Sequence, residues 1–227
     1  FVILIFLFMK YTRIAKDKID TEGLFDRLKG GFQFLPKHRS IFVFGVSSYM
    51  LFAFTVVEIH VVLPSYVKNF LNMGGAVFAS AEIYYSFGAI FSGFLILRLF
   101  KRFNTVNAVI ILMTVVAFAF YFMCIYDILW IFFLGNFLLG ITNAGVRILR
   151  TTYIFNHVPN NLIGRANSVF GTLNIVVRML LIGLFALPFF QTEDNIRFGY
   201  LIGVIMMLLS IILLIIWYKR IVPAEKR

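Results

Sequence analysis

Six long apolar segments constrain the fold of this 227-residue chain more than any other feature. A helix needs about 20 apolar residues to cross the hydrocarbon core of a membrane, and each segment is long enough to do so. Charged residues make up only 14% of the chain, which excludes an ordinary soluble fold. We therefore predict an all-α, polytopic membrane protein with six transmembrane helices. The expected spans are residues 41–66, 76–98, 105–126, 129–155, 165–190 and 198–218.

The chain outside these spans divides into three parts. Residues 1–9 are apolar and lack the basic start and cleavage site of a signal peptide. We interpret them as the end of a preceding transmembrane helix, so that the chain would be a fragment of a longer protein. Residues 10–40 are polar and basic with apolar residues at helical spacing, which predicts a cytoplasmic connector with a short amphipathic helix, or alternatively a solvated loop. Residues 41–218 would then form the six-helix bundle and residues 219–227 a cytoplasmic tail.

Basic residues are distributed unequally between the two ends of the spans. They gather in residues 10–40, 98–102 and 219–227, whereas only Lys68 and Arg197 lie at the opposite ends. Lys and Arg accumulate in cytoplasmic loops, so we expect the connector and the C-terminus to face the cytoplasm. This orientation explains the net charge of +11 without a nucleic-acid partner.

Two neighbouring spans each carry one stripe of polar residues. Within each stripe the positions advance by four, three and four residues, which places them on one face of a helix. Polar and ionisable residues at membrane depth are costly and usually mark a substrate or ion pathway. We therefore predict that both helices line a polar cavity. The first stripe is Asn136, Gly140, Asn143 and Arg147, and the second is Asn167, Gly171, Asn174 and Arg178.

The arginines within the spans differ in depth. Arg178 is near the middle of its span, where it could bind an anionic group of a substrate or pair with a carboxylate, including one outside this chain. Arg147 lies closer to the cytoplasmic end and Arg150 closer still. For these two, extension of the side chain to the membrane surface is the alternative to a role in the cavity.

Two carboxyl side chains are expected at similar depth on sequential spans. Glu58 lies in the outer third of the first span, and Glu82 lies about as deep in the second. An apolar environment disfavours the charged carboxylate, so both are candidates to share or relay a coupling proton. The alternative is that each reaches external water at the membrane interface. The three histidines and the single cysteine show no metal-ligand spacing, and we expect no metal and no cofactor.

The order of polar and apolar spans suggests an internal repeat. Spans 105–126 and 198–218 contain no charged residue, which suits lipid-facing support, whereas the other four carry polar residues at depth. Two polar spans followed by one apolar span occur twice. A three-plus-three repeat of opposite topology is a recurrent design of transporters.

With two loop motifs, these features resemble the major facilitator superfamily, specifically spans seven to twelve of its twelve-span fold. Gly93, Arg98, Lys101 and Arg102 match a cytoplasmic loop pattern of the family, although Leu97 replaces its acidic residue and Phe100 its second glycine. The turn containing Gly164 and Arg165 is similar to the loop after span ten, with Ile163 in place of the first arginine.

The resemblance implies a secondary active transporter rather than an enzyme, and within the family the chain looks most like bacterial efflux permeases of the macrolide and enterobactin type. It implies proton-coupled export of small organic molecules across a bacterial inner membrane, with the missing amino-terminal half, the substrate, protons and lipid as partners. Uptake or exchange of an anionic solute, such as a sugar phosphate or organic acid, is the alternative. A non-transporting sensor or assembly subunit and an intramembrane enzyme are the other classes considered. The fragment alone is not expected to transport.

Overall fold

The computed structural model describes residues 38–99, 103–192 and 194–225, and every regular element in these ranges is helical. Six helical segments are long and apolar enough to cross a membrane, which confirms the predicted all-α, polytopic fold. The interpretations of residues 1–9 and of most of the connector at 10–40 lie outside the described residues. The six segments are Arg39–Phe70, Gly75–Ile96, Thr105–Ile125, Leu129–His157, Leu162–Phe185 and Asn195–Ile216.

The first segment is a chain of four consecutive helical elements. Helix α3 (Arg39–Val57) is followed by a π-helical stretch, η1 (Glu58–Val62), by the single turn α4 (Leu63–Ser65) and by a second π-helical stretch, η2 (Tyr66–Phe70). The sequence predicted an end at residue 66, so the segment is longer than expected. It ends at Phe70, and two residues later Asn72 has a φ of 52°, a left-handed conformation that asparagine tolerates.

Pro64 gives a physical reason for the wide turns in this segment. Its ring nitrogen has no hydrogen to donate, and the ring would clash with the carbonyl group of His60 in a regular α-helix. In η1 the N–H of Leu63 instead bonds to the carbonyl oxygen of Glu58, five residues earlier. The helix continues through the proline because its turns widen.

The remaining spans follow the predicted order with short connections. Helix α8 ends at Phe185 and not near residue 190, because Leu187 is extended and Pro188 begins a separate 3₁₀ turn. The elements are α5 (Gly75–Leu99), α6 (Thr105–Ile125), α7 (Leu129–His157), α8 (Asn160–Phe185), η4 (Pro188–Gln191), η5 (Asn195–Arg197), α9 (Phe198–Ile216) and α10 (Tyr218–Glu225).

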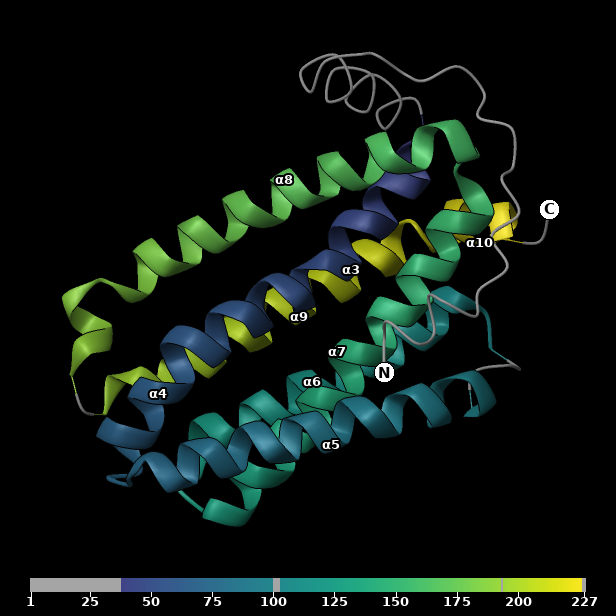
Figure 1. The fold of residues 1–227 in the computed structure, drawn as a ribbon. Coiled ribbons are helices and arrows are strands. Elements are labelled where there is room, and N and C mark those ends of the chain that lie inside the picture. The colour runs from purple at the N-terminus through teal and green to yellow at the C-terminus, as the bar shows by residue number, and fades with distance from the viewer. Residues whose placement is uncertain (1–37, 100–102, 193, 226–227) are drawn as a thin grey trace, which may run out of the picture.

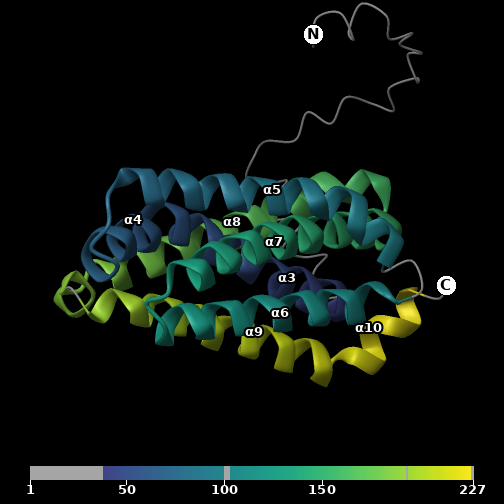
Figure 2. The same ribbon diagram turned by 90° about the horizontal axis from the view of Figure 1, so that it is seen from below.

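The helices pack side by side in the order α5, α7, α6, α9, α3, α8. In Figure 1, α3 lies between α8 and α7, with α9 behind it. Figure 2 shows α6 and α9 together on one side of the bundle and α5 and α8 on the other. The two apolar spans that the sequence assigned to support are thus α6 and α9, and they lie behind the helices that carry the polar stripes.

Helices α5 and α7 approach each other through glycines. A Cβ atom added to Gly88 of α5 would overlap the carbonyl oxygen of Phe137, and one added to Gly140 of α7 would overlap that of Tyr85. Small residues allow such close backbone contact between helices in lipid. By contrast, Gly183 of α8 has no neighbouring atom within 4 Å of an added Cβ.

Replacement of Gly140 by alanine is therefore expected to destabilise the protein. The overlap with the Tyr85 carbonyl forces α5 and α7 apart, and overpacking of this kind costs about 1–3 kcal/mol. Thermal and denaturant unfolding of the detergent-solubilised full-length protein would measure the loss. Gly183→Ala is the matched control, and equal stability of the two variants would contradict the close α5–α7 contact.

Candidate functional site

The polar residues of α7 and α8 lie in three groups, one between α8 and α3, one between α7 and α3, and one between α7 and α5. Asn136, Asn143 and Asn174 are buried, Arg178 is half-buried and Arg147 is exposed. Helix α8 packs along α3 and barely touches α7, so the two stripes do not face each other directly. We call the side of the bundle formed by α5, α7, α3 and α8, opposite α6 and α9, the cavity face.

The first group joins α8 to α3. Arg178 donates from Nε to Oδ1 of Asn174 at 2.6 Å, and its Nη2 donates to the same oxygen. Asn174 in turn donates from Nδ2 to the backbone carbonyl of Tyr49 at 3.2 Å. The Arg178 guanidinium also lies 5.1 Å from the centre of the Phe52 ring. The four-residue spacing within the stripe thus produces a direct hydrogen bond between its last two members.

The second group joins α7 to α3. Arg150 is 4% exposed and donates from Nη1 to the backbone carbonyl of Ser48 at 3.1 Å. Its guanidinium lies 3.6 Å from the centre of the Tyr49 ring and 5.9 Å from that of Phe52. Arg150 therefore points into the bundle and does not extend to the membrane surface. Among the described residues, Arg150 and Arg178 contact a backbone carbonyl, an amide and aromatic rings, and neither pairs with a carboxylate.

A third set of polar residues lies between α5 and α7. Asn143 donates from Nδ2 to the hydroxyl oxygen of Tyr85 at 2.8 Å. Glu58 and Arg147 are both close enough to Tyr85 to interact with it electrostatically. Asn136 bonds within its own helix, from Nδ2 to the carbonyl of Phe132 at 2.9 Å. Tyr85 was not among the residues singled out in the sequence, yet it connects the α7 stripe to α5.

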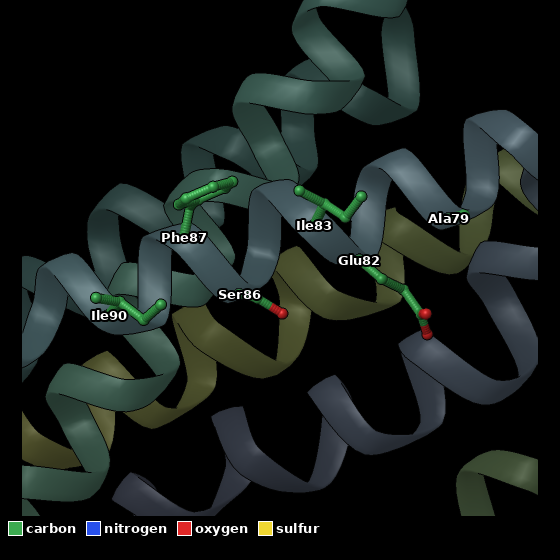
Figure 3. Close-up of a pocket in the computed structure, with 6 residues that line it drawn as sticks. All are labelled: Ala79, Glu82, Ile83, Ser86, Phe87 and Ile90. Carbon is green, nitrogen blue, oxygen red and sulfur yellow. The ribbon is translucent and has the colours of Figure 1, made fainter.

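Glu82 is exposed on the cavity face. It lines a cavity of about 280 Å³ with Tyr85, Ser86 and Asn136, and a second of about 510 Å³ along the outer surface of α5. Figure 3 shows the Glu82 and Ser86 side chains leaving α5 toward one side and Phe87 toward the other. The carboxylate of Glu82 is thus accessible to a solute in these cavities.

Glu58 lies in a different environment. Its side chain is 0% exposed, and its Oε1 accepts a hydrogen bond of 3.0 Å from the hydroxyl of Tyr200 on α9. Its Oε2 has no hydrogen-bond partner among the described residues. Tyr200 was not predicted from the sequence, because its span carries no charge. A tyrosine hydroxyl in a buried span needs a partner, and this requirement is the signal that could have identified it.

The loop motifs are only partly described. Gly93 and Arg98 are exposed, and an added Cβ on Gly93 would meet no atom within 4 Å; Lys101 and Arg102 lie outside the described residues. Gly164 is exposed near the start of α8, and Arg165 is half-buried. Within the described ranges, no group of three or more His, Cys, Asp or Glu side chains could hold a metal ion.

The fold and the polar cavity face define a multi-pass α-helical membrane protein with ionisable side chains at membrane depth. The sequence model of the Major Facilitator Superfamily matches residues 1–181. The chain therefore belongs to the Major Facilitator Superfamily and is a membrane transporter by family. No curated protein gives a match to the sequence.

The contrast between two arginines three residues apart on α7 is testable. Arg150→Ala removes a hydrogen bond from a charged donor and a buried contact with Tyr49, and we expect a loss on the order of 3 kcal/mol in unfolding free energy. Arg147→Ala, at an exposed position, is the matched control and should change stability by no more than about 0.5 kcal/mol. Unfolding of the full-length protein in detergent would measure both. Equal effects would show that the Arg150 contacts contribute nothing.

Proposed function

We propose that this protein is a secondary active transporter that couples proton movement to the export of small organic molecules of drug or siderophore type. The observation that supports this most directly is the contrast between two carboxyl groups on sequential spans. Glu82 is open to the cavities, whereas Glu58 is sealed inside the bundle. Carboxyl groups at membrane depth are typical of proton pathways in transporters. An accessible carboxyl group and an occluded one on sequential spans could pass a proton between the cavities and the interior of the bundle.

The cavity face suits organic solutes that combine rings with polar groups. Tyr49, Phe52 and Tyr85 supply aromatic surface, and Asn143 and Asn174 lie beside them. Small-molecule sites are mostly apolar with a few placed polar groups that fix orientation. We infer that Arg178, Asn174, Arg147, Asn143 and Asn136 line the substrate path.

The cavity face is proposed to be completed by another part of the transporter. Helices α5 and α8 stand at the two ends of the packing order, and the side chains of Glu82 and Arg147 are exposed on the cavity face, where lipid would be a costly neighbour for charged groups. We propose that the amino-terminal half of the same transporter covers this face, in a bacterial inner membrane, with the connector and C-terminus in the cytoplasm. The two halves would then rock against each other around the substrate path.

Proton coupling can be tested with glutamine variants of the full-length transporter in proteoliposomes. Amphipathic drugs, siderophores and organic anions would serve as substrates, and substrate-dependent proton movement would be measured with a pH-sensitive dye. We expect Glu82→Gln or Glu58→Gln to retain substrate binding but to lose proton-driven transport by about tenfold or more, as one lost interaction of ~1.4 kcal/mol would produce. Normal coupling in both variants would overturn the assignment of these carboxyl groups.

Exchange or uptake of an anionic solute is a second candidate, and the arginines favour it. In the part of the chain that the structure describes, the Arg178 and Arg150 guanidinium groups pair with no carboxylate, and Arg147 is exposed near Tyr85. A carboxylate or phosphate on the substrate would supply the missing negative charge. Sugar phosphates and organic acids fit this chemistry.

An Arg178→Ala variant separates the two candidates. If the substrate is anionic, loss of hydrogen bonds to a charged group worth about 1.5–3 kcal/mol should weaken its binding by about 10- to 100-fold. Binding of labelled substrates to the full-length protein would measure this change. Arg220→Ala, on the short helix α10, is the matched control and should bind normally. If only anions are transported and Arg178→Ala weakens their binding, the proposal of drug or siderophore export would give way to uptake or exchange of an anion.

A further inference from the structure

The Glu58–Tyr200 pair lies on the side of α3 that faces α9, away from the cavities. Both side chains are 0% exposed, although one comes from the first span and the other from the last. The Tyr200 ring is held edge-on against Tyr66 at 4.9 Å and lies 5.8 Å from Phe120. Tyr66 itself is anchored by a hydrogen bond of 2.7 Å from its hydroxyl to the carbonyl of Met123. The phenol that meets Glu58 is therefore fixed from three sides.

Among the residues that the structure describes, no positive charge compensates the Glu58 carboxyl. The elements packed against η1 are α3, α4, α8 and α9. Of the titratable groups near it, Tyr200 comes from α9 and Tyr85 from α5, and both are neutral phenols. Helix α8 contributes Arg178, whose recorded contacts are Asn174 and Phe52. A buried carboxylate with one hydrogen bond and no cation is costly, whereas the uncharged acid fits the site.

We propose that Glu58 and Tyr200 form an occluded proton-binding site, with Tyr200 as the positioning residue. The Tyr200 hydroxyl donates to Oε1, which becomes the carbonyl oxygen of the protonated acid, and Oε2 carries the proton. This use of the site rests on the proposed proton-coupled transport. The proposal assigns a role in proton binding to Tyr200 of the peripheral helix α9, which lies away from the cavity face.

The π-helical stretch offers the site a route to the cavity. Glu58 is the first residue of η1, and its neighbour Ile59 lines the cavity that contains Glu82. Successive helical residues point about 100° apart, so a rotation of that order would turn the carboxyl from Tyr200 to the cavity. Single π-helical turns inside α-helices occur frequently at functional sites. In the open position the Oε2–H bond breaks and the proton passes to water or to the Glu82 carboxylate, leaving Glu58 ionised.

Infrared difference spectroscopy of the full-length transporter in lipid tests the proposal directly. Protonated buried carboxyl groups give a C=O stretching band that is separate from the bands of carboxylates. We expect such a band at neutral pH in the unmodified protein and its loss in Glu58→Gln. Tyr200→Phe keeps the ring but removes the donor, so the band should persist and shift to higher wavenumber. Tyr66→Phe, which removes a neighbouring phenol hydroxyl that bonds elsewhere, is the matched control and should leave the band in place.

Two results would overturn the proposal. The first is a spectrum in which Glu58→Gln removes no protonated-carboxyl band, which would mean that Glu58 is ionised in its buried position. The second is an unshifted band in Tyr200→Phe, which would mean that Tyr200 does not hold the acid. Circular dichroism and melting of each variant would establish that it is folded. The infrared band reports proton binding at Glu58 and does not report transport. If transport proves not to be proton-coupled, the band can still be present, so failure of the proposed function and failure of this proposal give different results.

Discussion

Polar groups in a hydrocarbon environment must find partners inside the protein, and this requirement governs the structure. Most small polar side chains satisfy it locally: Thr55 and Thr142 bond to carbonyl oxygens one turn earlier in their own helices. These bonds hold nothing else in place. Glu58, Asn143 and Asn174 instead find partners on other helices, and each therefore fixes one helix against another. Helix α3 and its π-helical continuation take part in two of these three connections, so polar contacts as well as packing hold the first span to α8 and α9.

The fold was predictable because its determinants are local. Length and apolar composition identify a membrane span without knowledge of its neighbours, and all six spans were predicted from them. The errors occur at prolines. Pro64 widens the turns of the first span and lets it continue to Phe70, and Pro188 begins a separate turn that ends α8 at Phe185. Hydropathy does not distinguish these cases, since both prolines lie in apolar surroundings and differ only in the backbone geometry around them.

The polar contacts were predictable only within a helix. Helical spacing places Asn174 and Arg178 on one face, and the structure shows them hydrogen-bonded. Helical spacing in the sequence does not reveal which helices are neighbours, so the partners Tyr85 and Tyr200 were missed. Tyr200 was the harder of the two, because an otherwise apolar span gives no stripe to follow. The two carboxyl groups were expected at similar depth. Their environments differ because Glu58 points toward Tyr200 of α9, whereas Glu82 points into the cavities.

The position of Phe52 offers a physical link between the proposed substrate path and the proposed proton site. Its ring centre lies 5.9 Å from the guanidinium group of Arg150 on α7 and 5.1 Å from that of Arg178 on α8, two helices that barely touch. Any change in the spacing of α7 and α8 around a substrate must therefore move against α3. Glu58 lies six residues further along the same segment, where its α-helix gives way to π-helical turns. Coupling requires one element whose equilibrium both ligands bias. Among the described elements, the first span contacts Arg150, Arg178 and Tyr200. A rotation of that span is therefore the simplest physical link between the proposed substrate path and the proposed proton site.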